Sequence, residues 1–325
     1  MFEFNLKKQL SSNCMIDVSF GAREGEVTTL IGKSGAGKSS ILNLIAGVVP
    51  LDEGYIRSEG IDYTDIPVYQ RQFGYVQQQS HLFPHLSVYD NLTYSNNTEK
   101  LEEYLDIFEL RPHLDKKIKL LSGGEAQRVS FVRTLMSQPR LLLLDEAFSA
   151  LDRILKLKLR QYLKQLKVPI LLITHDLEEA YEISDQIILI EKGKIIEKGE
   201  TKSLFRQCRK IKTAVFLGIE NLYPATFFEN ELRIEHFKCT GVRPTSIFKT
   251  VAIKATQISL VEEGHFAKIK TLTSKLERVR LELEVLGLSR PLIVELTWRE
   301  YAPFKGREEV RFEINEFIYL EDSLC

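Results

Sequence analysis

The sequence predicts an α/β domain, in which helices flank a parallel sheet, followed by a smaller all-β domain. Through about residue 205, short apolar runs alternate with segments whose apolar residues recur at helical spacing. Beyond that point apolar residues recur at every second position, which is typical of strands with one buried face. A chain of 325 residues with 44% hydrophobic content can form two cores. We therefore expect one domain over residues 1–205 and a second over residues 206–325.

Four apolar runs in the first domain are expected to form its buried sheet. They cover residues 27–31, 141–144, 170–174 and 186–190. Each is bounded by a turn or breaker signal: a glycine loop, an acidic pair, Pro169, or the turn at residues 191–194. Residues 153–167, between the second and third runs, carry apolar side chains at helical spacing and predict a helix. Residues 101–108 form a second amphipathic stretch.

The second domain is expected to be a small antiparallel barrel. Apolar residues alternate with charged or polar ones over residues 251–255, 279–285, 292–298 and 310–314. Short alternating strands with no helix between them favour such a barrel.

Composition excludes several classes of protein. Lys and Arg number 44 against 45 Asp and Glu, so no net field steers the chain toward nucleic acid, and we expect no nucleic-acid partner. The longest apolar runs stop far short of the roughly 20 residues that cross a bilayer. Four cysteines lie far apart without a CxxC pair, which predicts reduced thiols rather than a zinc site.

Residues 32–39, GKSGAGKS, match the phosphate-loop pattern GxxxxGK[ST] between an apolar strand and the helical segment 40–46. Glycines let the backbone N–H groups curl around phosphate, and the helix N-terminus adds positive potential. Lys38 is expected at the β- and γ-phosphates and Ser39 at Mg²⁺. The position between strand and helix disfavours an accidental glycine-rich turn. The expected nucleotide-binding residues here are Gly32, Lys33, Ser34, Gly35, Ala36, Gly37, Lys38, Ser39 and Ser40.

A second half of a nucleotide site follows in residues 141–146, LLLLDE, where a buried strand delivers two carboxylates at its C-terminal end. Asp145 is expected to hold the Mg²⁺ coordination shell. Glu146 is placed to orient or deprotonate the attacking water. A strand that merely ends in solvated acids is a poor explanation beside a phosphate loop.

Residues 121–128, LSGGEAQR, precede that strand, and with them the chain resembles the ATP-binding subunit of an ABC transporter. In that family two subunits enclose two ATP molecules, and the signature of one caps the phosphate bound by the other. The resemblance implies a homodimer in which Ser122, Gly123 and Gly124 contact ATP held by the partner. Ser122 would also cap the helix that follows, which is compatible with this role.

Three further family segments occur in order. The Q-loop falls at residues 73–78, and we assign Gln78, although three glutamines at 77–79 leave the register open by one. The resemblance implies that Gln78 joins Ser39 and Asp145 at Mg²⁺ and that this loop contacts the membrane subunit. Asp152 matches the D-loop, and His175 matches the switch histidine, with Lys38 and Glu146 completing the catalytic set.

Two positions depart from the family pattern. Relatives usually stack adenine on an aromatic residue some 25 to 30 positions before the loop lysine, yet residues 8–17 contain no aromatic. Because stacking on a base contributes roughly 1–3 kcal/mol, we expect ATP affinity about tenfold or more weaker than in relatives. The second departure is Ala147, where the family commonly has proline.

The second domain resembles the OB-like, TOBE/MOP-like barrels of importers for molybdate, sulfate, ferric iron, polyamines and sugars, which serve dimer contact and regulation. The short N-terminal part and the motif spacing look most like the molybdate importer. In the family, such a barrel can bind an oxyanion, and we state oxyanion binding here as a hypothesis. Residues 268–275 are the nearest counterpart of the family's binding segment, but their sequence departs from it. The alternative is a purely structural dimerisation barrel.

The resemblance implies the ATP-hydrolysing subunit of an importer, with ATP and Mg²⁺ as ligands. Expected partners are a second copy, integral-membrane permease subunits and, indirectly, a solute-binding protein, at the cytoplasmic face of the inner membrane as a peripheral protein. Molybdate or a similar anion is the expected solute, with sulfate, ferric iron, polyamine or sugar as alternatives. Soluble ABC proteins of translation or repair usually carry two cassettes or a coiled-coil insertion, and this chain has neither.

Overall fold

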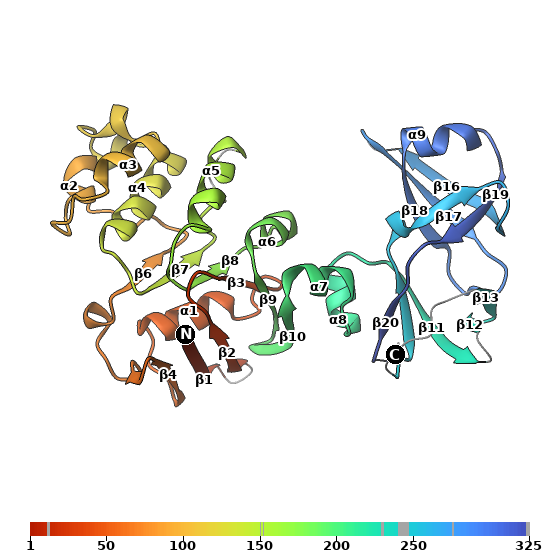
Figure 1. The fold of residues 1–325 in the computed structure, drawn as a ribbon, viewed down its shortest axis with the longest axis horizontal. Coiled ribbons are helices and arrows are strands. Elements are labelled where there is room, and N and C mark those ends of the chain that lie inside the picture. The colour runs from red at the N-terminus through yellow and green to blue at the C-terminus, as the bar shows by residue number, and fades with distance from the viewer. Residues whose placement is uncertain are drawn as a thin grey trace. The chain divides into compact units, whose positions relative to one another are not determined.

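The fold is that of a computed structural model, which is described for all residues except 12–13, 150, 152, 229–230, 240–246, 275 and 323–325. The chain divides into two compact units, Met1–Lys202 and Ser203–Cys325 (Figure 1). Each unit is described by itself. None of the helices in the described residues is long and apolar enough to cross a membrane.

A ten-stranded sheet organises the first unit, and one half of it is parallel. In the order β9-β3-β8-β7-β6, this half contains β9 (Gln186–Glu191), β3 (Val27–Ile31), β8 (Ile170–Ile173), β7 (Leu141–Asp145) and β6 (Phe73–Val76). Every residue of β3, β7 and β8 is buried, as expected for strands covered on both faces. The predicted α/β fold class is confirmed, although the third strand ends at Ile173 rather than Thr174.

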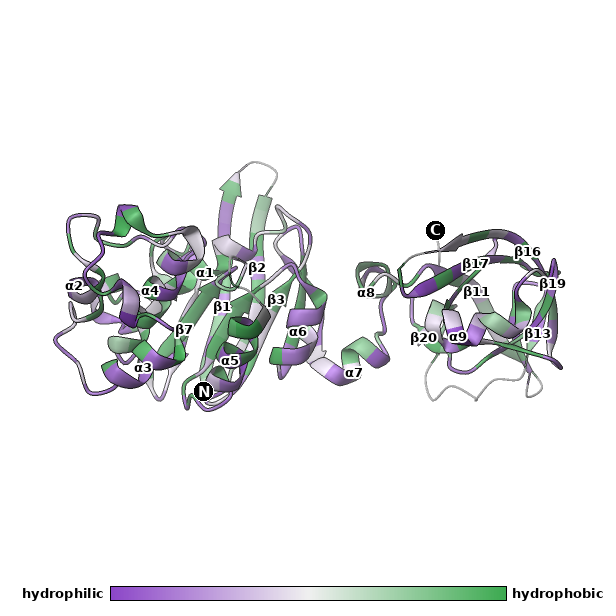
Figure 2. Cartoon of the chain, turned by 90° about the horizontal axis from the view of Figure 1, so that it is seen from above, coloured by the Kyte–Doolittle hydropathy of each residue, from purple (hydrophilic) through white to green (hydrophobic). Residues whose placement is uncertain are grey.

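The other half of the sheet is largely antiparallel and was not predicted. It runs β5-β4-β1-β2-β10, formed by β5 (Ile61–Asp62), β4 (Glu53–Ser58), β1 (Phe2–Ser11), β2 (Cys14–Ala22) and β10 (Lys194–Glu200). Alternate residues of β1 and β2 are buried in one core with α1. In Figure 2, apolar residues (green) run along β3 and β7, whereas α6 carries many polar residues (purple).

Helices cover the sheet and form a separate helical part. The helices of the first unit are α1 (Lys38–Ala46), α2 (Val88–Leu92), α3 (Leu101–Ile107), α4 (Gly123–Met136), α5 (Arg153–Leu163) and α6 (Leu177–Ile183), with short 3₁₀ turns at Val68–Gln70, Arg111–His113 and Ile118–Leu120. The helix predicted over 153–167 therefore ends at Leu163. Side chains of α3 and α4 pack with β7 and α5 in one apolar core. Two helices, α7 (Thr201–Arg206) and α8 (Ile211–Phe216), follow β10.

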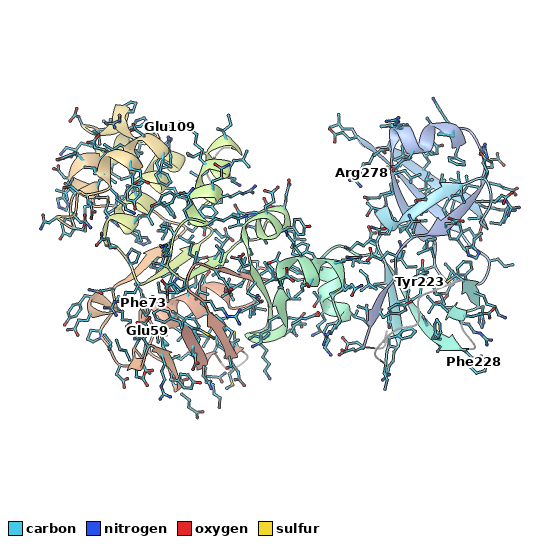
Figure 3. The ribbon with its side chains drawn as sticks, in the orientation of Figure 1. Glu59, Phe73, Glu109, Tyr223, Phe228 and Arg278 are labelled. Atoms are coloured by element: carbon cyan, nitrogen blue, oxygen red, sulfur yellow. The ribbon has the colours of Figure 1, made fainter. Side chains whose placement is uncertain are left out.

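Apart from short helices, which include α8 and most of α7, the second unit is all-β, as its predicted class requires. One sheet has the order β13-β12-β11-β14-β20, with β11 (Asn221–Phe228), β12 (Glu231–Ile234), β13 (Phe237–Cys239), β14 (Thr250–Ile253) and β20 (Ile318–Leu320). The other has the order β15-β19-β16-β17-β18, with β15 (Ile258–Val261), β16 (His265–Ser274), β17 (Arg278–Glu284), β18 (Leu292–Thr297) and β19 (Glu309–Ile314). Both sheets contribute to one apolar core, which includes Tyr223 of β11 (Figure 3).

Three predicted strands of this unit end earlier than expected, and one of them, β17, stops at Glu284 rather than at Val285. Ala255 begins a 3₁₀ turn, Ala255–Gln257, because β14 stops at Ile253. Trp298 begins α9 (Trp298–Tyr301) rather than ending a strand. Thr297 accepts a hydrogen bond from the Glu300 N–H, and the Glu300 carboxylate accepts one from the Thr297 N–H. This capping box starts a helix that the apolar alternation does not reveal.

Candidate nucleotide site

A cavity of about 520 Å³ lies at the carboxyl ends of the parallel strands. The phosphate loop after β3 forms one wall, and Gln78 after β6, Glu146 after β7 and His175 after β8 approach from the neighbouring strands. Parallel strands deliver their following residues to the same edge of a sheet, which explains why residues far apart in sequence meet here. The other lining residues are Leu10, Cys14, Gly32, Ser34, Gly35, Ala36, Gly37, Lys38, Ser39, Ser40 and Ile173.

The phosphate loop depends on two glycines that leave no room for a side chain. A Cβ on Gly32 would lie 2.3 Å from the Ile190 carbonyl oxygen of β9. A Cβ on Gly37 would lie 2.6 Å from Ile16 of β2, and Gly37 also has a φ of 100°, which L-residues rarely adopt. The loop is thus fitted closely between β9 and the β1–β2 hairpin, and α1 begins directly after it.

Lys38, the first residue of α1, is folded over the loop. Its Nζ donates hydrogen bonds to the carbonyl oxygens of Gly32 at 2.9 Å and Lys33 at 3.0 Å. Burial lowers the pKa of the Lys38 ammonium, while the charges of Glu146 and Asp145 act in the opposite direction. An anionic phosphate would offset the cost of burying this charge. Lys33 itself contributes its backbone but does not line the cavity.

Asp145 is the last residue of β7, is buried, and is not among the residues that line the cavity. Burial raises the pKa of its carboxyl group, and the nearby Glu146 charge adds to this, while a hydrogen bond from Ser39 and the Lys38 charge oppose it. The hydrogen bond between Ser39 and Asp145 brings together two of the three expected Mg²⁺ ligands. The third, Gln78, lines the cavity. Carboxylate, hydroxyl and amide oxygens are the ligands that Mg²⁺ prefers, so these residues fit that ion.

The Glu146 carboxylate is held between two residues from other strands. Gln78 Nε2 donates a hydrogen bond to Glu146 Oε2 at 3.3 Å, and His175 Nδ1 lies 3.4 Å from Glu146 Oε1. The geometry brings together three residues that the sequence analysis assigned separately, and it places Gln78, rather than its two neighbours, in the cavity.

The signature residues lie elsewhere, at the start of α4. Ser122 caps this helix: its hydroxyl accepts a hydrogen bond from the Glu125 N–H, and Glu125 Oε2 accepts one from the Ser122 N–H at 2.6 Å. His113 Nε2 lies 3.3 Å from the other Glu125 oxygen. Ser122, Gly123 and Gly124 are absent from the cavity lining of their own chain, which is compatible with contact to a nucleotide on a second copy. Asp152 lies outside the described residues.

Leu10 and Cys14 also line the cavity, although they were not predicted from the sequence. Both come from the β1–β2 hairpin, in which Ser11 pairs with Cys14 after a register shift. Leu10 is 38% exposed and offers an aliphatic surface near the phosphate loop. Nothing in the local sequence marked these residues, since the signal sought there was an aromatic side chain. Only the pairing of the hairpin beside the loop reveals them.

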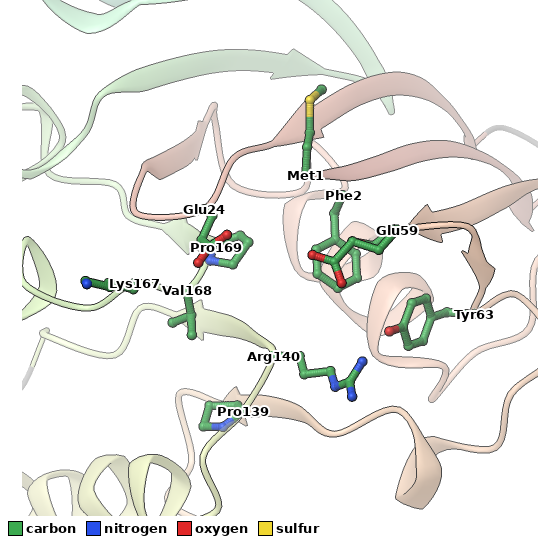
Figure 4. A pocket seen from close by; sticks show the side chains of 11 residues that line it. Met1, Phe2, Glu24, Glu59, Tyr63, Pro139, Arg140, Lys167, Val168 and Pro169 are labelled. Atoms are coloured by element: carbon green, nitrogen blue, oxygen red, sulfur yellow. The ribbon is translucent and has the colours of Figure 1, made fainter.

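A second cavity of about 340 Å³ lies at the opposite edge of the sheet (Figure 4). Arg140 directly precedes β7 and Pro169 directly precedes β8, so this cavity is at the amino ends of those strands. Glu24, Glu59 and Lys167 add charges of both signs. It contains none of the residues that the sequence analysis assigned to a site.

The proposed oxyanion region of the second unit, residues 268–275, lies mostly in β16. Its backbone pairs with β17 and in part with β19, with a register shift between Ile269 and Thr271. Lys268 Nζ lies 3.9 Å from a Glu309 carboxylate oxygen. Lys275 lies outside the described residues, and oxyanion binding here stays a prediction.

The chain is similar to known proteins over most of its length. The family described as ABC transporter matches residues 15–149. The spermidine/putrescine import ATP-binding protein PotA of Haemophilus influenzae is 35% identical, over 96% of this chain and 85% of its own length. The Fe(3+) ions import ATP-binding protein FbpC of Escherichia coli O157:H7 is 34% identical, over 98% and 93%. The molybdate/tungstate import ATP-binding protein WtpC of Archaeoglobus fulgidus is 44% identical, over 59% and 85%.

Solved structures resemble the first unit. The structure of an ATP-binding subunit of an ABC transporter has a TM-score of 0.58 and 27% identity, covering 63% of this chain and 91% of that chain. The dimeric structure of a bacterial ABC transporter cassette has a TM-score of 0.55 and 25% identity, covering 62% and 99%.

Proposed function

Because this chain belongs to the family of import ATP-binding subunits of ABC transporters, we propose that its cavity binds MgATP and drives the import of a small solute. The chain is an ATPase that uses ATP and Mg²⁺. One observation supports the site assignment above all: a phosphate loop, the strand-end Glu146, a glutamine and a histidine from four strands meet in one cavity.

The chemistry proposed for this cavity is phosphoryl transfer to water. Loop N–H groups and Lys38 neutralise the charge of the phosphates, since Lys38 needs only to turn from the loop carbonyls toward them. Ser39, Asp145 and Gln78 would hold Mg²⁺, which would supply positive charge to offset that of the phosphates. Glu146 accepts the proton of the attacking water, and His175 and Gln78 hold its carboxylate in position.

The proposed working unit is a homodimer in which each nucleotide lies between one phosphate loop and the partner's signature. The position of Ser122 outside its own cavity and the dimeric structure of a related cassette support this arrangement. Closure around ATP and reopening after hydrolysis would form a two-state cycle that moves the permease subunits. Those subunits would receive solute from a solute-binding protein, with this chain peripheral on the cytoplasmic side.

Two classes of solute have support. Similarity to the molybdate/tungstate relative is higher, at 44%, but covers 59% of this chain. The relatives named for polyamine and ferric iron match nearly the whole chain, at 35% and 34%. We retain a molybdate-like anion as the first candidate and a polyamine or ferric iron as the second, with sulfate and sugars further behind. If the solute is a molybdate-like anion, we also propose that binding of such an oxyanion to the second unit regulates the ATPase.

A pulldown from a detergent extract tests the transporter assignment. The tagged chain should copurify with an integral membrane protein, whereas recovery of ribosomes or DNA-repair proteins instead would contradict it. The solute is then tested on the purified complex in proteoliposomes with its binding protein, by ATP-dependent uptake of molybdate, sulfate, spermidine or ferric iron. Uptake of the two cations and of neither anion would reject the first candidate.

A further inference from the structure

The backbone of Glu146 has a conformation that its residue type does not favour. Its φ is 50°, in the left-handed region that glycine adopts freely and other L-residues adopt rarely. Such a conformation persists only where surrounding contacts hold it, and these positions cluster at functional sites. The contacts that hold Glu146 therefore bear on where its carboxylate points.

Three residues from different segments bond to the Glu146 backbone. Its N–H donates to the Ile173 carbonyl at 3.0 Å. Its carbonyl accepts from the Ser149 hydroxyl at 2.9 Å and from the Ser149 N–H at 3.2 Å. The third donor is Gln127, whose Nε2 lies 3.2 Å from the same carbonyl oxygen. Ile173 lies on the neighbouring strand β8, and Ser149 is three residues further along the chain, whereas Gln127 reaches Glu146 from the second turn of α4.

Gln127 is well suited to hold this carbonyl. Its side chain is 4% exposed, so its amide lies away from competing water. A buried amide without a partner is costly, which makes this contact a stable one. The next residue, Arg128, donates to the Phe108 carbonyl at 2.9 Å and so ties α4 to the helical part. The helix thus contacts the catalytic strand through Gln127 and the helical part through Arg128.

We infer that Gln127 is a positioning residue for ATP hydrolysis, which fixes the Glu146 carbonyl and thereby aims the Glu146 carboxylate at the attacking water. If Glu146 relaxed from the left-handed region, its Cβ direction would change and the carboxylate would leave Gln78 and His175. This inference rests on the proposed function, because α4 begins at the signature that contacts the partner's nucleotide. Gln127 then links the nucleotide of one site to the base of the other.

The substitution Gln127→Met tests this role, since it removes the amide donor at similar side-chain size. We expect kcat to fall about tenfold, because the loss of one hydrogen bond raises the activation barrier by enough for about a tenfold change in rate. The KM for ATP should stay within about twofold, and the Hill coefficient for ATP should fall toward 1. Gln127→His, whose ring Nε2–H can reach the same carbonyl, should restore kcat to within about threefold. A purely structural role for Gln127 would not lower kcat at constant KM, and Gln127→His would not restore kcat.

A matched control removes a comparable bond from the other end of α4. The Ser95 hydroxyl donates to the Met136 carbonyl at 3.2 Å, so Ser95→Ala should leave kcat and cooperativity unchanged. Ser149→Ala removes another donor to the Glu146 carbonyl, and its effect on kcat should be non-additive with that of Gln127→Met. If Gln127→Met did not fold, Ser149→Ala would still have to lower kcat at constant KM.

Normal kcat and cooperativity in Gln127→Met, or a raised KM with normal kcat, would overturn the inference while leaving the proposed function intact. An additive Ser149→Ala and Gln127→Met pair would overturn it as well. ATP hydrolysis by the wild-type chain in the same assay tests the proposed function independently of Gln127. An absence of any ATP hydrolysis by wild-type protein would remove both.

Discussion

Glu146 is the residue on which the proposed chemistry depends. Glu146→Gln keeps the size of the side chain and a polar contact to both Gln78 and His175, but it can no longer take a proton. We expect ATP turnover to fall by about 100-fold or more, while ATP binding stays within a few fold. Phosphate release and nucleotide titration measure the two effects. Glu262→Gln, at an exposed pair with Arg307 in the second unit, is the matched control. A normal turnover rate in Glu146→Gln would disprove the assignment of the base.

Leu10 is the residue that tests the missing aromatic. It lines the cavity beside Cys14 on the β1–β2 hairpin, where it offers only an aliphatic surface to a base. Leu10→Tyr supplies a stacking face, and we expect ATP affinity to rise about tenfold with little change in kcat. Isothermal titration of wild type and variant measures this. Met15→Tyr, on the same hairpin but outside the cavity lining, should leave affinity unchanged. Equal affinity in Leu10→Tyr, or micromolar binding by wild type, would mean that adenine is held by other groups.

Among the elements, α1 carries the phosphate loop at one end and is held at the other by Arg71. The Arg71 guanidinium is buried and donates to the carbonyl oxygens of Ile45, Ile66 and Thr64 at 2.7, 2.7 and 2.9 Å. Gly47 ends α1 with a φ of 82°, and a Cβ there would lie 2.5 Å from the Arg71 Cζ. The end of the helix and this guanidinium therefore occupy a shared, closely filled space.

Arg71→Met should destabilise the first unit by about 3 kcal/mol or more, because one buried and two partly buried carbonyls lose their donors. The unfolding transition of this unit in urea measures the loss. Arg57→Met provides the comparison, since Arg57 pairs with Asp62 on an exposed surface and its loss should cost less than about 1 kcal/mol. If both variants unfolded at the same urea concentration, the buried guanidinium would have no special role.

The elements also show what the sequence could and could not predict. Runs such as residues 141–144 are apolar throughout because both faces are covered, so they were recognised as strands. Strand β1 alternates apolar and polar residues only from Phe2 to Leu6, after which Lys7, Lys8 and Gln9 are all polar, and β2 alternates from Ile16 to Ala22. Such short alternations are a weaker strand signal than a continuous apolar run before a glycine loop. Trp298 continued an apolar alternation, but the cap formed by Thr297 and Glu300 ended the strand.

Motif spacing was a better guide to the site than to the sheet. Gln78, Glu146 and His175 were assigned one by one, and the structure brings them into one cavity because parallel strands end at a common edge. Leu10 and Cys14 could not be assigned, since they reach the cavity only through hairpin pairing over a register shift. Gln127 lay inside a recognised motif, yet its hydrogen bond to Glu146 depends on packing that no spacing reveals.

For the whole molecule, the proposed homodimer predicts that two defective chains can complement each other. Lys38→Ala damages the phosphate loop and Ser122→Arg damages the signature, so each chain alone should be inactive. In a mixture of equal parts, half of the dimers would be mixed and each would have one intact site, restoring about a quarter of wild-type activity. Coupled-enzyme assays of the mixture measure the recovery.

The control for complementation mixes Lys38→Ala with Glu146→Gln. Both changes affect the half-site that one chain supplies to its own nucleotide, so the mixed dimer has no intact site and no activity should return. Recovery in this mixture, or its absence in the first, would contradict the arrangement in which Ser122 serves the partner's nucleotide. Brisk hydrolysis by a chain kept monomeric would contradict it too.

The fully buried strands β3, β7 and β8 have a consequence for amide hydrogen exchange. Their N–H groups are bonded within the centre of the sheet and should exchange with deuterium only when the first unit unfolds globally. The residues just beyond their carboxyl ends leave the ladder and should exchange by small local openings. ATP should slow exchange in those loops. The exchange rate along each strand would therefore show at which residue the globally protected part of the sheet ends and the part that responds to nucleotide begins.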